Sequence, residues 1–283
     1  MAETGKKKRM KKWLAVTLAV VFSIAFILGF LQLGAVYSMH AWEYWRPDYE
    51  KTDILPILEK SELSEEDYNV LYRQTGLTKL GIDDLLSEGK AGRILQIQEL
   101  YFKPFTVEND CFAPFTYMAE IDWNALLTTL KDGDILISAT TFTSWFRYGH
   151  SALVVDGADK LVVESVSPGE RSELASALEF TDRASFMVLR AKAEETVRRE
   201  VAAYARENLV DLPYRLTMGI FFKKFKQTPA YSHCSHLVWY AYKKYGIDLD
   251  STGGGVVTPR DIARSSNLEL VQTFGFNPEK LWG

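Results

Sequence analysis

A cysteine between two histidines is the first feature of this 283-residue chain that could carry chemistry. The segment TPAYSHCSHLVWYAYKKYGIDLD, residues 228–250, places Cys234 just before an apolar, aromatic run. Leu237, Val238 and Ala241 fall on one face if that run is helical. Cys234 is therefore expected at or near a helix N-terminus, where the helix dipole and free backbone N–H groups favour a nucleophilic thiolate.

A cysteine nucleophile also requires a base, and the chain contains four histidines, His40, His150, His233 and His236. His40 adjoins an apolar N-terminal segment and is a poor candidate. His236 is two residues along the predicted helix from Cys234 and projects away from it. His150 is the favoured base, and His233 stays open as an alternative.

A carboxylate is expected opposite His150. Two predicted strands, 149–157 and 160–166, are joined around the sequence VDGAD. A three-residue loop at 156–158 would pair His150 with Glu164. Other loop lengths shift this pairing, and contact then requires that both side chains stay on one face of the sheet.

The elements that must position these residues begin near residue 130. Short apolar runs at 132–138, 149–157, 160–166 and 185–191 predict an antiparallel sheet. An amphipathic pattern in EETVRREVAAYARENL, residues 194–209, predicts a helix after the sheet and before the Cys234 helix. The sequence thus predicts an α+β fold in which a sheet packs on helices.

An uncharged apolar segment precedes these elements. It runs from Trp13 to Leu31 and stays apolar to Tyr37, long enough to span a bilayer as a helix. Six basic residues precede it, so the positive-inside rule predicts a cytoplasmic N-terminus and an extracytoplasmic remainder at the cell membrane. A cleaved signal peptide is the alternative, although the run exceeds the usual signal core. The rest of the chain is exported in either case.

Several motifs resemble one known family. GDILI, GHSALVVDG, VVES, DLPY and YSHCSHLVWYAYKKYGIDLD, with the later VTPRDI, resemble the permuted papain-like hydrolases of the NlpC superfamily, in particular the YiiX-like branch, over roughly residues 130–270. The histidine strand precedes the cysteine helix, as in the permuted branch. The resemblance implies Cys234 as nucleophile, His150 as general base and Glu164 as orienting residue. His233 departs from the family pattern, in which an aromatic residue is expected there.

Four segments are predicted. They are a cytoplasmic basic tail (1–12), a transmembrane helix (13–37), a juxtamembrane linker with a helical accessory segment acting as cap or stalk (38–129), and a permuted papain-like catalytic domain (130–283). Within the accessory segment, Ser64 followed by three acidic residues resembles a helix start.

The predicted function is that of a membrane-anchored extracytoplasmic cysteine hydrolase, an amidase or peptidase that cleaves amide or ester bonds through a thioester. The Cys234 backbone N–H is a natural oxyanion donor, with Tyr231 or Tyr214 as candidates for the second. A cell-wall peptidoglycan peptide, or a lipid or acylated amino acid, is the expected substrate. The alternative is a catalytically inactive papain-like binding module at the cell surface. The sequence leaves the oligomeric state open.

Composition and spacing argue against other classes. No CxxC or HxxxH spacing surrounds Cys234, so neither a metal site nor a cofactor is predicted. Beyond residue 12 the chain has 27 basic and 36 acidic residues, and nucleic acid is not an expected partner. A Cys111–Cys234 disulfide would consume the nucleophile, so none is predicted.

One basic, aromatic segment, residues 216–229, lies between the two predicted helices. It contains Lys223, Lys224 and Lys226 among phenylalanines. Such a segment can bury its aromatic rings against the core, or it can settle on an anionic membrane. The hypothesis favours contact with the membrane or with a lipid-linked substrate.

Overall fold

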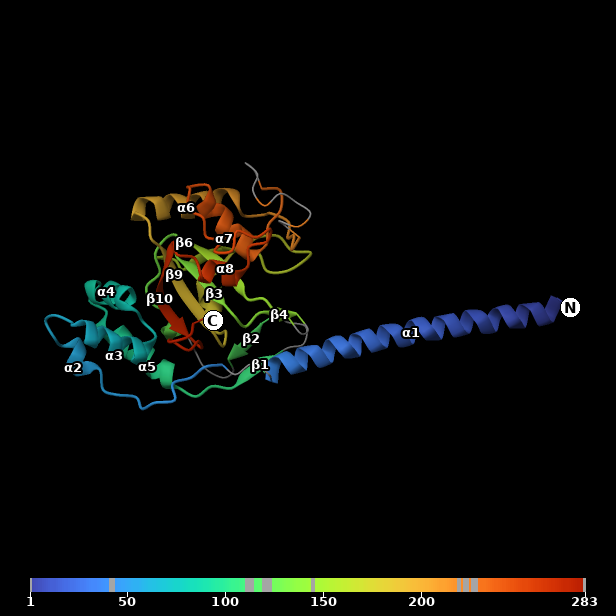
Figure 1. Cartoon of the computed structure of the whole chain (residues 1–283), viewed down its shortest axis with the longest axis horizontal. Helices are drawn as coiled ribbons and strands as arrows, with labels where there is room; N and C mark the ends of the chain where they lie inside the picture. The colour runs from blue at the N-terminus through green and yellow to red at the C-terminus, as the bar shows by residue number, and fades with distance from the viewer. Residues whose placement is uncertain are drawn as a thin grey trace.

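A six-stranded antiparallel sheet lies at the centre of the part of the chain that the structure describes (Figure 1). The computed structural model describes residues 2–40, 44–109, 115–118, 124–143, 146–217, 220, 224 and 229–281. The strand order is β10-β9-β3-β6-β7-β8. The strands are β3 (Ile135–Ser138), β6 (His150–Asp156), β7 (Leu161–Glu164), β8 (Glu173–Ser176), β9 (Phe186–Ala191) and β10 (Leu268–Phe274).

The central strands bury side chains on both faces of the sheet. In β3, Ile135 and Ile137 belong to one hydrophobic core and Leu136 belongs to another. Because successive side chains of a strand point to opposite faces, the two cores lie on opposite sides of the sheet. Each face therefore requires a covering layer, and the fold is a mixed α+β arrangement.

One layer consists of the helices that follow the sheet. Helices α6 (Glu195–Asn208), α7 (Cys234–Lys243) and α8 (Pro259–Ala263) lie together on one side in Figure 1. Both α6 and α7 contact the central strand β6. The two helices predicted from the sequence are confirmed, and the second of them carries the cysteine.

The other layer is the accessory segment. It contains α2 (Leu55–Leu58), α3 (Glu65–Thr75), α4 (Lys79–Ser87) and α5 (Ala91–Phe102). Ser64 caps α3 in a reciprocal capping box with Asp67, as its sequence suggested. Buried residues of this segment share one core with Leu136, Val154 and Phe186 of the sheet. It therefore forms a layer of the sheet domain, and its role as an accessory cap or stalk stays a prediction.

A buried ion network joins the accessory segment to the sheet. Arg190 of β9 donates two hydrogen bonds of 2.8 Å to Asp134, which precedes β3, and one of 2.6 Å to Asp84 of α4. Arg190 and Asp134 are at most 3% exposed. Charges that are buried this deeply need complete pairing, so the network fixes α4 against the sheet.

Two strands of this sheet were not predicted. Strand β8 is short and exposed, and it pairs with β7 at the edge. Strand β10 pairs with β9 only after the chain has crossed the helical layer. The remaining short elements are β1 (Val107–Asn109), β2 (Thr116–Met118), η1 (Asn124–Leu126), β4 (Phe142–Thr143), β5 (Phe146–Arg147) and η2 (Ala177–Phe180).

The β6–β7 connection differs from the expected three-residue loop. Asp156 pairs with Leu161 across a four-residue turn, and a bulge in β6 separates that pair from the pairing of Val154 with Val162. Lys160 closes the turn with φ of 54°, in the left-handed region. The register is therefore two residues away from a direct pairing of His150 with Glu164.

Helix α1 (Ala2–His40) projects from the folded body in Figure 1. Its segment Arg9–Gly34 contains an 18-residue stretch with a mean hydropathy of 2.7, and none of that stretch is buried against the described remainder of the chain. Length and composition make it a helix that could span a bilayer. In the described ranges no other helix meets that standard.

Candidate active site

Cys234 is the first residue of α7, as its sequence context predicted. His233 is the N-cap residue, with extended backbone angles, and its Nδ1 accepts the backbone N–H of His236 at 3.4 Å. The Cys234 N–H belongs to the first turn and has no intrahelical acceptor. The thiol is buried and free. Cys111 lies outside the described residues, so the predicted absence of a bridge stays a prediction.

His150 and Glu164 meet across the neighbouring strands β6 and β7. Nε2 of His150 lies 2.6 Å from Oε2 of Glu164, and the residues are 1% and 2% exposed. A register shift of two residues keeps both side chains on one face, which explains why the contact forms without direct pairing. With Nε2 bound to Glu164, Nδ1 is the ring nitrogen left for Cys234.

The electrostatics of this group favour an ion pair between sulfur and imidazole. Burial acts to raise the pKa of the Cys234 thiol, but the imidazoles of His150 and His233 outweigh it and hold that pKa well below its usual range. Burial also opposes the charged form of His150, yet Cys234 and Glu164 raise the pKa of His150 above its ordinary value. The pKa of Glu164 is lowered because its bond to His150 outweighs burial.

Two aromatic rings fix the imidazole of His150. Phe115 meets it edge to face at 5.5 Å between centroids, and Phe180 stacks on it at 5.7 Å with an interplanar angle of 25°. Such packing restricts the ring to one orientation and excludes water from its faces. Neither contact could be predicted from the sequence, because Phe115 and Phe180 are distant from His150 along the chain.

The other two described histidine side chains of the site have distinct environments. His236 contacts the Lys224 carbonyl oxygen through Nε2 at 2.7 Å, and burial lowers its pKa to about 4. His236 is therefore neutral, and its predicted orientation away from the thiol stays a prediction. His233 uses Nδ1 as an acceptor, so its proton resides on Nε2. That Nε2 is buried without a hydrogen-bond partner in the described part of the chain.

The two candidate tyrosines differ. Burial and then the charge of Cys234 raise the pKa of Tyr214, which identifies it as a neighbour of the thiol. Tyr231 packs against Arg215, whose guanidinium carbon is 4.5 Å from the ring centroid. Tyr214 is twenty residues from Cys234 along the chain, but an isolated parallel β-bridge to Ser232 holds it beside the start of α7.

The basic segment before α7 is partly accounted for. Lys224 Nζ forms an ion pair with Asp250 and donates to the Gly254 carbonyl at 2.8 Å. Its ammonium also lies 4.7 Å from the Trp239 ring centroid. The charge of Lys224 is therefore paired within the domain, and contact of this segment with a membrane or a lipid-linked substrate stays a hypothesis. Lys223 and Lys226 lie outside the described residues.

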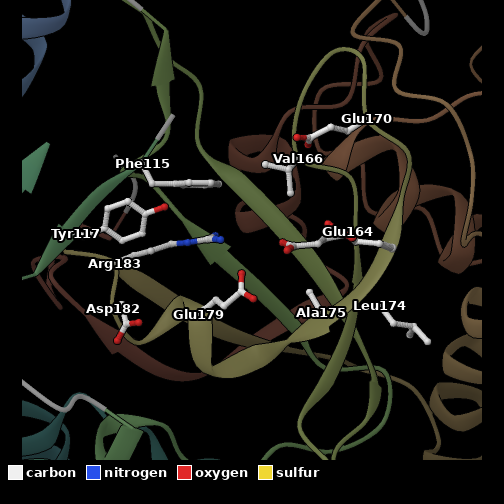
Figure 2. A pocket seen from close by; sticks show the side chains of 11 residues that line it. Phe115, Tyr117, Glu164, Val166, Glu170, Leu174, Ala175, Glu179, Asp182 and Arg183 are labelled. Carbon is white, nitrogen blue, oxygen red and sulfur yellow. The ribbon is translucent and has the colours of Figure 1, made fainter. Parts of the chain in front are cut away.

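A cavity of about 500 Å³ adjoins Glu164 (Figure 2). Its lining residues are Phe115, Tyr117, Glu164, Val166, Glu170, Glu173, Leu174, Ala175, Glu179, Asp182 and Arg183. Glu164 thus lines the cavity and also contacts His150. Searched over the described ranges, the structure contains no cluster of three His, Cys, Asp or Glu residues suited to a metal ion.

The comparisons with known proteins reach a distant relative. No family model matches the chain. A Bacillus subtilis (strain 168) protein named "Uncharacterized protein YycO" is 29% identical over 150 residues, which cover 52% of this chain and 58% of that protein. The chain therefore matches less than two thirds of this relative's length. The name of that protein states no activity.

Proposed function

We propose that this protein is a membrane-anchored cysteine hydrolase of the amidase or peptidase type. The observation that carries the proposal is the buried His150–Glu164 pair beside a thiol at a helix start, with the pKa of Cys234 held low. A nucleophile, a base and a group that orients the base are the parts that thiol acyl transfer requires. The order of strand and helix is consistent with a permuted papain-like fold of the NlpC superfamily, YiiX-like branch.

The proposed reaction has two steps. The Cys234 thiolate attacks the carbonyl carbon of an amide or ester, and the bond to the leaving group breaks while the His150 imidazolium gives that group its proton. A water then attacks the thioester carbon and gives a proton to His150, the carbon–sulfur bond breaks, and the carboxylic product leaves. Glu164 keeps Nε2 of His150 protonated, so that Nδ1 exchanges the proton throughout.

The developing negative charge on the carbonyl oxygen needs donors. The Cys234 backbone N–H is free for this purpose at the start of α7. The Nε2–H of His233 and the Tyr214 hydroxyl are the candidates for the second donor, because both neighbour the thiol. His233 was not predicted in this role, and its sequence signal is its position immediately before Cys234.

The location follows from the N-terminal helix. We propose a single span with the basic tail in the cytoplasm and the hydrolase domain outside, since six basic residues precede the apolar segment. Substrates at the cell surface, a cell-wall peptide or a lipid or acylated amino acid, then fit this location. The ion pair of Lys224 with Asp250 weakens the support that this basic segment gives to a lipid substrate.

The test is turnover by the full-length protein in detergent micelles, incubated with cell-wall fragments and with lipid extracts and followed by mass spectrometry. Wild type is expected to release a carboxylic product, and Cys234→Ala and His150→Ala are each expected to abolish release without unfolding the protein. A Cys234→Ala variant with normal turnover would exclude the nucleophile. A folded wild type that hydrolyses neither extract would favour a binding module.

A further inference from the structure

A second buried charge, Arg183, lies next to the proposed catalytic residues. It is 2% exposed, and its guanidinium carbon is 4.0 Å from the Phe115 ring centroid and 3.9 Å from that of Phe180. Its Nε and Nη1 have no hydrogen-bond partner among the described residues. Figure 2 shows the guanidinium pointing into the cavity, toward the same space as Glu164 and Glu179.

Arg190 provides an internal comparison, because it is buried to nearly the same extent. At 3% exposed, Arg190 donates to both carboxylate oxygens of Asp134 and to Asp84. The fold therefore pairs one buried arginine completely and leaves donors of Arg183 open. Because buried donors are ordinarily satisfied, open donors beside a cavity indicate a ligand that carries acceptors.

Charge balance alone does not account for Arg183. The Glu164 carboxylate attracts this guanidinium, and a positive charge here helps to keep Glu164 ionised. That role requires a charge but not a planar group with donors directed into a cavity. An arginine fork is suited to two parallel bonds with a carboxylate.

The rim of the cavity has the opposite charge. Its exposed acidic residues are Glu170, Glu173, Glu179 and Asp182. With Glu164, five carboxylates surround the single guanidinium. A simple anion would be repelled by the rim, and a simple cation would be repelled by Arg183. A molecule that carries both charges a few bonds apart can pair with the acidic rim and with Arg183 at once. The cavity volume of about 500 Å³ is within the size range of ligand pockets.

We propose that this cavity binds an amino-acid-like zwitterion, such as an unblocked dipeptide that carries an ammonium and a carboxylate group. The Arg183 fork donates to its carboxylate, and the rim carboxylates, Glu179 first, accept from its ammonium group. Glu164 lines the cavity and also binds His150, so the ligand lies beside the proposed catalytic group. Its role as a substrate subsite rests on the proposed function, whereas its binding does not.

The test is calorimetric titration of the full-length protein in detergent micelles. Every protein titrated carries the Cys234→Ala substitution, so that no thioester can form. The probes are alanyl-alanine, which carries both charges, N-acetyl-alanyl-alanine, which carries only the carboxylate, and alanyl-alanine amide, which carries only the ammonium. Alanyl-alanine is expected to bind about tenfold or more tighter than either blocked probe. Charge-assisted hydrogen bonds have this magnitude.

Variants test separately the contact of Arg183 with the carboxylate and the contact of Glu179 with the ammonium group. Arg183→Met is expected to lower the affinity for alanyl-alanine by about 10- to 100-fold. Its affinity for alanyl-alanine amide is expected to stay the same or to rise. Glu179→Gln, at an exposed position, is expected to lower the affinity for alanyl-alanine and for its amide. The affinity for N-acetyl-alanyl-alanine is expected not to change. Arg199→Met removes an exposed arginine on α6 and is expected to change nothing.

Two results would overturn the proposal. One is the absence of saturable binding by alanyl-alanine, and the other is equal binding of all three probes. If Arg183→Met fails to fold, as judged by its unfolding temperature, the Glu179→Gln titration decides by itself. Binding with this pattern in a protein that lacks hydrolase activity would refute only the proposed function. Hydrolysis by wild type without probe binding would refute only the zwitterion site.

Discussion

The bond between His150 and Glu164 can be tested without knowledge of the substrate. The atoms Nε2 and Oε2 are 2.6 Å apart and buried, so the carboxylate stabilises the imidazolium through a charge-assisted hydrogen bond. Such a bond contributes about 1.5–3 kcal/mol. Since one pKa unit corresponds to about 1.4 kcal/mol, Glu164→Gln is expected to lower the pKa of His150 by about 1–2 units.

The assay is NMR of full-length protein labelled with ¹⁵N-histidine in micelles, because imidazole nitrogen shifts report both protonation and tautomer. The chain has only four histidines, and the His150 signal is identified by its loss in a His150→Gln variant. In wild type, His150 should stay protonated at pH values above the ordinary histidine pKa, because the pKa of His150 is raised. Glu164→Gln should lose the imidazolium at lower pH.

Glu173 supplies the matched control, since it pairs with Glu164 across β7 and β8 and is exposed. Glu173→Gln should move the His150 titration by a few tenths of a unit at most, since solvent screens its charge. A Glu164→Gln titration that coincides with wild type would refute the assignment of Glu164 as the partner of the imidazolium.

The same pair also predicts how stability depends on pH. Glu164 has a lowered pKa when folded, so its contribution is present above its unfolded pKa and is lost as pH falls through the folded value. His150 has a raised pKa when folded, so its contribution is present below its unfolded pKa and is lost as pH rises through the folded value. The stability difference between wild type and Glu164→Gln should therefore be largest between these limits, in chemical denaturation of both proteins.

Three further changes have definite expected outcomes. Cys111→Ser should keep hydrolase activity, and non-reducing peptide mapping should recover Cys234 as a free thiol; a predominant bridge between the two cysteines would contradict this. Arg190→Met should lower the free energy of unfolding by about 3–5 kcal/mol in denaturant titrations, because it leaves Asp134 buried without its partner; a loss below about 1 kcal/mol would show that the network is not needed. His233→Asn should keep the helix cap but lower kcat more than it raises KM if Nε2–H is an oxyanion donor, and unchanged kcat would exclude that role.

The chemistry-bearing residues could be predicted from the sequence because their signals are local. An apolar helical pattern that starts at Cys234 identifies a helix N-terminus, and the structure begins α7 at that residue. The strand that contains His150 and the one that contains Glu164 are adjacent hairpin partners, so their proximity follows from a short connection. The charge-free apolar run near the N-terminus is likewise visible from composition alone.

The exact register could not be predicted, because it depends on the turn. The bulge near Val155 and the left-handed Lys160 moved the pairing by two residues. A one-residue shift would have placed Glu164 on the opposite face, and the sequence contains no signal that separates these outcomes.

Tertiary packing alone decided the surroundings of the site. The accessory helices became a layer of the sheet because strands such as β3 bury side chains on both faces, and the second face needs a cover. Phe115, Phe180 and Arg183 meet His150 and Glu164 only after segments distant in sequence pack together. Sequence patterns report which residues can form helices and strands and carry reactive groups, whereas burial and long-range contacts fix which charges lie together and therefore their pKa values and ligands.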